Sequence, residues 1–296
     1  MIKDTLKTLG DSARSLFRNW RGLLLLSALY AALLACCYVF FSTGQANAWQ
    51  LVVSALTALA APLLFFALQA GVANFALPDR TFGALVRGTL RDFLKVLLLS
   101  LPLIALGVLF VYLLGKLQAY LPKPDEATHV YVSATAEPKP VPLHWPDALA
   151  SSLWLLLLGI ILPLLAAHLW LSAARDGLLL TLKKIHRVVG RAFLPQSILV
   201  YSVGLFVFGL MPYFILFTRT SVSNGWTELL LFGLRLVLAF VFTLWGWTIT
   251  LGALARTTPG EPSNVGMPTA DESPVPSPTV AEATPVVETP AQLQES

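Results

Sequence analysis

Charged residues are scarce in this chain. Only 12% of its 296 residues are charged while 56% are hydrophobic, and the mean hydropathy is +0.72. Soluble domains carry about 25% charged residues. A chain this apolar cannot bury its hydrophobic surface in one water-soluble core, so we expect a bilayer to solvate much of it. The composition predicts an integral membrane protein.

Residues that carry chemistry are also few. The only cysteines, Cys36 and Cys37, are adjacent within an apolar run, where a thiol behaves as a small hydrophobe, so a disulfide framework is excluded. No P-loop, Gly-x-Ser-x-Gly or His-Glu-x-x-His motif is present. The four histidines lack a carboxylate or cysteine at metal-ligand spacing: His129, His144, His168 and His186. We expect no metal, no cofactor and no nucleic-acid partner, and we do not expect an enzyme.

Long apolar runs are the dominant feature of the sequence. A transmembrane helix needs about 20 mostly apolar residues. Six stretches qualify: Leu23 to Phe41, Leu51 to Leu68, Val96 to Leu114, Leu153 to Ala173, Ile198 to Phe217, and Leu229 to Leu254. The sequence therefore predicts an all-α membrane protein with six spans. Prolines interrupt four of these spans and favour local kinks: Pro62, Pro102, Pro163 and Pro212.

Basic residues are distributed unequally between the two sides of these spans. One side has four: Lys116, Lys123, Lys139 and Arg219. The other has fifteen: Lys3, Lys7, Arg14, Arg18, Arg21, Arg80, Arg87, Arg91, Lys95, Arg175, Lys183, Lys184, Arg187, Arg191 and Arg256. Because Lys and Arg are retained on the cytoplasmic side, both termini are predicted to be cytoplasmic. Compact loops and the absence of an Asn-x-Ser/Thr site fit a bacterial inner membrane.

A cleaved signal peptide is the alternative interpretation of the first apolar run. Ala46-Asn47-Ala48 matches the small-residue cleavage pattern, and cleavage would leave five spans. Against it, the run of 19 residues exceeds the roughly 7 to 15 of a signal sequence, and a long basic segment precedes it. We favour six spans.

A short pattern recurs before the outgoing spans. Arg87 to Leu94 matches Arg187 to Leu194 at an offset of one hundred positions, in both arginines and the Phe-Leu pair. Pro62-Leu63-Leu64 is mirrored by Pro163-Leu164-Leu165, and Arg14 and Arg18 provide a weaker third copy before the first span. These matches predict three repeats of one unit, a basic interfacial helix followed by a helical hairpin.

The basic segments, 1–21, 79–95 and 178–194, have helical periodicity. In the second, the predicted apolar face is Phe82, Leu85, Val86, Leu90 and Phe93. The first and third are similarly amphipathic, which is typical of interfacial helices. Their predicted apolar faces are Ile2, Leu6, Leu9, Ala13, Leu16, Phe17 and Trp20 in the first and Leu178, Leu182, Ile185, Val189 and Phe193 in the third. Six arginines on their polar faces are candidate ligands for anionic lipid headgroups: Arg14, Arg18, Arg87, Arg91, Arg187 and Arg191. The alternative is that these arginines only fix topology.

Two further segments are predicted to be aqueous. The external loop 116–147 is rich in proline, with a short strand-like stretch from His129 to Ser133, and suits an extended strap over the spans. The tail 256–296 is rich in Pro, Thr, Ser and Glu, and we expect it to be disordered, with docking of a protein partner as the alternative.

Ionisable residues at membrane depth are candidate functional residues within the membrane domain 22–255. Arg235 in the sixth span lies two helical turns after Glu228, which allows either snorkelling toward the interface or an internal ion pair. His168 in the fourth span suits packing better than proton relay. The leading function is a non-enzymatic accessory, scaffold or lipid-contacting membrane component. The alternative is a small transporter or channel with a polar path near Arg235.

Overall fold

A computed structural model describes residues 2–44, 46–77, 81–120, 145–218 and 225–257 of the chain. All secondary structure in these ranges is helical, and no strand occurs in them. The predicted tail and most of the predicted external loop, including His129 to Ser133, lie outside the described residues. The ends of that loop are helical, because α4 continues to Tyr120 and α5 begins at Trp145.

The helices follow one another in the order of the apolar runs. Their bounds are α1 Ile2–Arg18, α2 Trp20–Ser42, α3 Ala48–Phe75, α4 Phe82–Tyr120, α5 Trp145–Trp154, η2 Leu155–Ile161, α6 Leu162–Asp176, α7 Leu178–Lys183, α8 Ile185–Ala192, α9 Pro195–Leu205, η3 Phe206–Leu210, α10 Met211–Phe217 and α11 Gly225–Thr257. Here η marks a π-helical stretch. Six helical stretches are long and apolar enough to cross a membrane, at the six places predicted. A multi-pass membrane protein requires such a set of helices.

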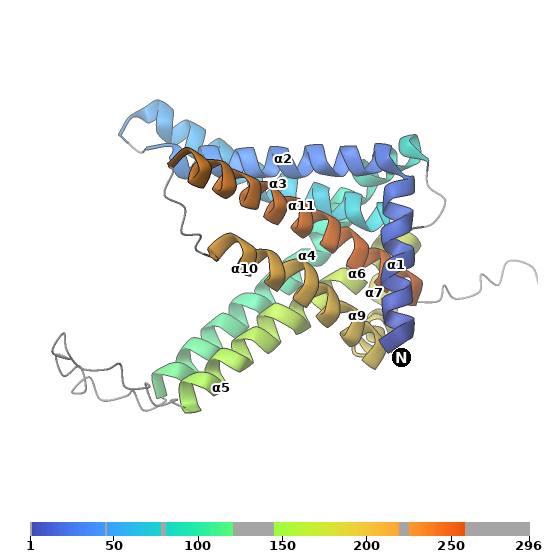
Figure 1. Ribbon diagram of the computed structural model, residues 1–296. Helices are drawn as coiled ribbons and strands as arrows, with labels where there is room; N and C mark the ends of the chain where they lie inside the picture. The colour runs from blue at the N-terminus through green and yellow to red at the C-terminus, as the bar shows by residue number, and fades with distance from the viewer. Residues whose placement is uncertain (1, 45, 78–80, 121–144, 219–224, 258–296) are drawn as a thin grey trace, which may run out of the picture. The chain divides into compact units, whose positions relative to one another are not determined.

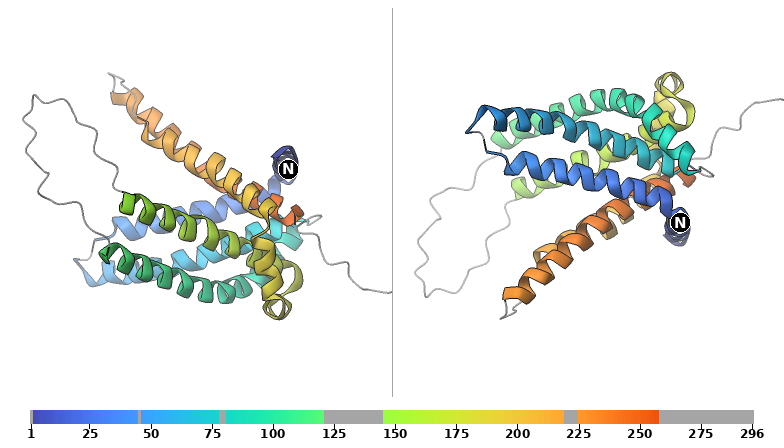
Figure 2. Two further views of the ribbon diagram at one scale, coloured as in Figure 1. Left: turned by 90° about the horizontal axis from the view of Figure 1, so that it is seen from below. Right: turned by 90° about the horizontal axis from the view of Figure 1, so that it is seen from above.

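The helices pack mainly at one end, which we call the basic end. It comprises α1, α7 and α8, the start of α4 and the last turns of α11 (Figures 1 and 2). Buried side chains concentrate near it, in residues 66–74 of α3, 164–174 of α6 and 244–255 of α11. Toward the opposite end the helices separate in Figure 1, and large apolar side chains are exposed there. Such exposure suits helices that face lipid.

Small residues allow the closest helix contacts. A Cβ atom added at Gly204 of α9 would overlap the side chain of Thr250 in α11, and one added at Gly246 would overlap Phe208. Gly71 of α3 lies similarly close to Leu26 of α2. Small residues bring helix backbones together in membranes, where no hydrophobic effect drives helices out of lipid. The contacts of Gly204 and Gly246 position the fifth and sixth spans against each other, and that of Gly71 positions the first two.

Two of the four prolines coincide with a change of helix type. Pro163 and Pro212 each follow a π-helical stretch, whereas Pro62 and Pro102 lie inside uninterrupted α-helices. Pro163 has no N–H to donate to the carbonyl four residues earlier, which belongs to Gly159. The Tyr201 hydroxyl of α9 donates to that carbonyl oxygen at 3.0 Å. Gly159 belongs to η2, where hydrogen bonds run to the carbonyl five residues earlier, and the Tyr201 contact ties this π-helical stretch of the fourth span to the fifth.

The basic segments differ in how they join the spans. α1 is a separate helix that crosses the end of α11, while the segment before the third span is continuous with it in the 39-residue α4 (Figure 1). The segment predicted as one helix over 178–194 is two short helices that meet at Lys184. Gly177, with a φ of 87°, makes the turn from α6 into α7. The three-unit repeat remains a prediction.

Candidate functional site

The six candidate arginines all lie on the helices of the basic end. Arg14 and Arg18 are exposed on α1, Arg87 and Arg91 are exposed on α4, and Arg187 is exposed on α8, where Arg191 is half-buried. Large apolar side chains are exposed beside them on the same helices: Leu6, Phe17, Leu90, Leu94, Leu179, Leu182 and Ile185. Exposed apolar and basic side chains at one level are typical of helices at a membrane interface.

The protein-facing side of α1 is not its most hydrophobic side. Its buried residues are Thr5, Leu9, Ser12 and Leu16, a stripe with helical spacing in which two members are small and polar. This stripe lies against α11, where Ser12 is close to Gly252. Leu6, which we predicted in the apolar face, is exposed instead. The large apolar side chains Leu6 and Phe17 therefore lie outside this stripe, and Phe17 packs edge-on against Trp245 of α11.

The start of α4 shows the same departure from the predicted faces. Leu90 was predicted in the apolar face and is 75% exposed, whereas Leu85, Gly88, Thr89 and Asp92 are buried. Asp92 lies among the basic residues of the segment 79–95. Its side chain is fully buried, at 0% exposure.

Three side chains hold the buried carboxylate of Asp92. Lys95 Nζ lies 2.6 Å from Oδ1, Arg91 Nε lies 3.1 Å from the same oxygen, and Asn74 Nδ2 of α3 donates to Oδ2 at 3.2 Å. Asn74 Nδ2 also donates to the Ala70 carbonyl at 2.9 Å. A buried charge is tolerated only when it is paired and hydrogen-bonded. This Asp92 cluster (Asp92, Lys95, Arg91 and Asn74) fastens α4 to α3 beside two candidate headgroup ligands.

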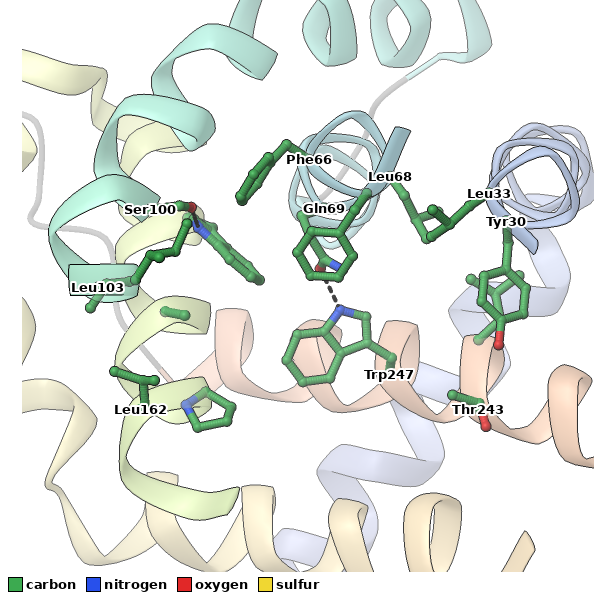
Figure 3. A pocket seen from close by; sticks show the side chains of 16 residues that line it. Tyr30, Leu33, Phe66, Leu68, Gln69, Ser100, Leu103, Leu162, Thr243 and Trp247 are labelled. Carbon is green, nitrogen blue, oxygen red and sulfur yellow. Dashed lines mark hydrogen bonds between the residues drawn. The ribbon is translucent and has the colours of Figure 1, made fainter. Parts of the chain in front are cut away.

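An apolar cavity of about 520 Å³ lies between five spans (Figure 3). Its lining comes from α2, α3, α4, α6 and α11: Tyr30, Leu33, Phe65, Phe66, Leu68, Gln69, Ser100, Leu103, Ile104, Leu162, Pro163, Ala166, Trp170, Thr243, Leu244 and Trp247. Two hydrogen bonds join side chains of this lining. Trp247 Nε1 donates to Gln69 Oε1 at 2.7 Å, and Trp170 Nε1 donates to Ser100 Oγ at 3.0 Å.

Neither Arg235 nor Glu228 lines this cavity. The Arg235 guanidinium donates to the carbonyl of Thr218, the residue that ends α10, and Glu228 lies exposed in the first turn of α11. This contact caps a helix end near the side opposite the basic end. A polar path or anion site at Arg235 remains a prediction.

His168 is buried in α6, and its Nε2 atom has no hydrogen-bond partner among the described residues. It does not line the cavity either. Within the described part of the chain, no group of three or more His, Cys, Asp or Glu side chains is placed to hold a metal. Cys36 Sγ donates to the Thr57 carbonyl of α3 at 3.4 Å, a contact between the first two spans.

Sequence reasoning missed Asp92 as a site residue. It is the only acidic residue between Arg80 and Lys95, and an isolated carboxylate within a basic stretch is a signal for an internal ion pair. Its partner Asn74 lies near the end of α3, in the second span. The sequence gives no sign that these two residues meet.

Comparison with known proteins gives no relative: no family model, no curated protein and no solved structure matches the chain.

Proposed function

We propose that this chain is a non-enzymatic, lipid-contacting component of a cell membrane, and that its basic end binds anionic headgroups on the cytoplasmic side. The observation that supports this most strongly is the pairing of exposed arginines with exposed leucines and aromatic residues on α1, α4 and α7–α8. Helices that only fix topology need the charges but not the adjoining apolar surface. Both features are combined in each basic segment.

The expected strength of this attraction follows from the number of arginines. Each basic residue near an anionic surface contributes about 1 kcal/mol, so six contribute roughly 6 kcal/mol before screening. At physiological salt the Debye length is about 8 Å, which weakens the contribution of the most exposed side chains. Arg191 is half-buried, and Arg91 is paired with the Asp92 carboxylate at 3.1 Å, so both should contribute less than the other four.

The proposal is tested by converting all six arginines to glutamine: Arg14, Arg18, Arg87, Arg91, Arg187 and Arg191. Native mass spectrometry in mixed-lipid nanodiscs then compares bound phosphatidylglycerol and cardiolipin with zwitterionic lipid. We expect anionic lipid to fall several-fold while zwitterionic lipid is unchanged.

Two controls make the result interpretable. The matched variant with lysine at the same six positions keeps the charge and should retain anionic lipid close to the wild-type amount. The glutamine variant must keep its orientation, which other basic residues should secure: Lys3, Lys7, Arg21, Arg80, Lys95, Lys183 and Lys184. Equal retention of anionic lipid in wild type and glutamine variant would reduce these helices to topology anchors.

A further inference from the structure

The cavity between the spans has the properties of a site for an apolar, flexible ligand. Of the residues labelled in Figure 3, Leu33, Leu103 and Leu162 form apolar walls on three different helices. A volume of about 520 Å³ lies within the roughly 300–1,000 Å³ range of ligand sites in proteins. Such a space left empty would deprive its lining atoms of dispersion contacts.

Four polar side chains in the wall, those of Trp247, Trp170, Ser100 and Thr243, donate hydrogen bonds within the protein, while Tyr30 brings a further hydroxyl to the lining. Both indole N–H groups donate to side chains, since Trp247 pairs with Gln69 and Trp170 pairs with Ser100. The serine and threonine hydroxyls bond to their own helices: Ser100 donates to the Val96 carbonyl at 2.7 Å, and Thr243 donates to the Ala239 carbonyl at 2.8 Å. Water needs two to four polar partners, and apolar cavities stay dry. Because most of the lining is apolar and most of its polar groups bond within the protein, a largely hydrocarbon occupant fits best.

The cavity reaches the surface that faces lipid. Its inner wall includes buried Leu103, Ala166 and Trp170, whereas Ile104 and Phe65 in its outer wall are 49% and 39% exposed. An occupant can therefore enter sideways from the bilayer. Acyl chains are the solvent on that side, and they are as apolar as leucine.

The depth of the cavity indicates which lipids can reach it. Ile104 lies nine residues beyond Lys95, about 14 Å along α4 at ~1.5 Å per residue. The hydrocarbon core is about 30 Å thick, so about 15 Å separates the interface from the middle of the bilayer. The cavity therefore spans the level of the acyl chains of the leaflet at the basic end.

We infer that this cavity binds one acyl chain of a phospholipid from the leaflet at the basic end. This goes beyond the proposed function, which concerns headgroup charge, because the cavity recognises a hydrocarbon chain and is indifferent to the headgroup. The bound chain completes the packing between α3, α4, α6 and α11, where the lining residues of the protein leave space. The lipid is then a structural component of the bundle.

The probe is phosphatidylcholine with a diazirine in the middle of one acyl chain, photolysed with the full-length protein in nanodiscs. Adducts are mapped by tandem mass spectrometry. We expect adducts on Leu103 and Trp170, which bulk lipid cannot reach because both are buried. Adducts confined to lipid-facing side chains such as Val108 would overturn the inference.

Cavity-filling variants provide the second arm. Ala166→Phe places a ring in the cavity and should lower adduct yield at Leu103 and Trp170 about tenfold, which corresponds to ~1.4 kcal/mol of lost affinity. The matched variant Ala105→Phe adds the same ring to an exposed residue outside the cavity lining and should leave these yields unchanged. Unchanged yields in Ala166→Phe would contradict the site.

A variant with a larger cavity shows whether a lower adduct yield could come from misfolding alone. Leu103→Ala widens the cavity and should keep or raise the yield at Trp170, whereas a loss in this variant as well would overturn the assignment. The six-arginine glutamine variant should label like wild type, because the phosphatidylcholine probe carries no net charge. Failure of headgroup binding and failure of the chain site are thus separable.

Discussion

The Asp92 cluster makes a quantitative prediction about stability. Lys95 Nζ lies 2.6 Å from the carboxylate with a side chain that is 26% exposed, whereas Arg91 lies 3.1 Å away and is 62% exposed. Lys95→Met leaves a buried carboxylate short of its closest cation, and breaking a buried pair in this way costs about 3–5 kcal/mol. Because Arg91 and Asn74 still bind the Asp92 carboxylate, we expect Lys95→Met to lower the free energy of unfolding by the bottom of this range, about 3 kcal/mol. Arg91→Gln removes a largely exposed partner and should cost about 0–1 kcal/mol.

A double-mutant cycle tests the cause of this difference. Asp92→Asn removes the charge but keeps the shape, so Lys95→Met should cost less in that background, with a coupling energy of about 1–2 kcal/mol. The assay is reversible unfolding in mixed micelles with increasing sodium dodecyl sulfate, followed by tryptophan fluorescence. Arg87→Gln is the matched control, since Arg87 is an exposed arginine of the same helix outside the Asp92 cluster, and it should not change the midpoint. Equal effects of Lys95→Met and Arg91→Gln, or purely additive effects in the cycle, would refute the buried-carboxylate account.

Two further substitutions test the packing of the spans in the same unfolding assay. Gly204→Ala should destabilise the protein by about 1–3 kcal/mol, because the added methyl overlaps Thr250. The control Gly233→Ala on α11 places its methyl in open space and should be tolerated. Equal unfolding midpoints of the two variants would contradict the close α9–α11 contact. Tyr201→Phe should lower the free energy of unfolding by roughly 0.6–1.7 kcal/mol, because it removes the hydroxyl that donates to the Gly159 carbonyl. An unchanged midpoint would show that this hydrogen bond contributes nothing to stability.

The six spans could be predicted from the sequence because each needs only a run of apolar residues, and hydrocarbon tolerates little else. How the basic helices join the spans could not be predicted. The helix predicted over 79–95 and the span predicted from Val96 form one continuous helix, α4, whose first turns pack on neighbouring helices through Leu85 and Asp92. Hydropathy measures burial in lipid and gives no signal for that contact.

Periodicity could not predict which side of each basic helix contacts the protein. It placed Leu6 and Leu90 on the apolar faces of interfacial helices, and both side chains are exposed. Beside a membrane the most apolar face has lipid as an alternative partner, so small and polar residues such as Ser12 and Thr89 pack against the protein. The same reasoning explains why Asp92 was missed. A pairwise contact such as Asp92 with Asn74 depends on how α3 and α4 cross, which no single-helix pattern encodes.

The candidate headgroup site could be predicted in part. The basic segments and their arginines were recognised from charge alone, and the structure places them on helices of one end of the bundle (Figure 1). The cavity could not be foreseen, because its lining comes from five helices and consists mostly of ordinary apolar residues. Only the three-dimensional arrangement identifies which leucines and tryptophans surround a space.

Membrane topology is the most direct test of the account, since headgroup binding requires all three basic segments to face the cytoplasm. Paired reporters, one active only in the cytoplasm and one only outside it, are fused after Leu182, after Thr257 and near Ala134. The fifteen-to-four division of basic residues predicts cytoplasmic signals from Leu182 and Thr257 and an external signal from Ala134. An external signal from Thr257, or opposite signals from Thr257 and Leu182, would contradict the six-span arrangement and with it the proposed lipid-binding face.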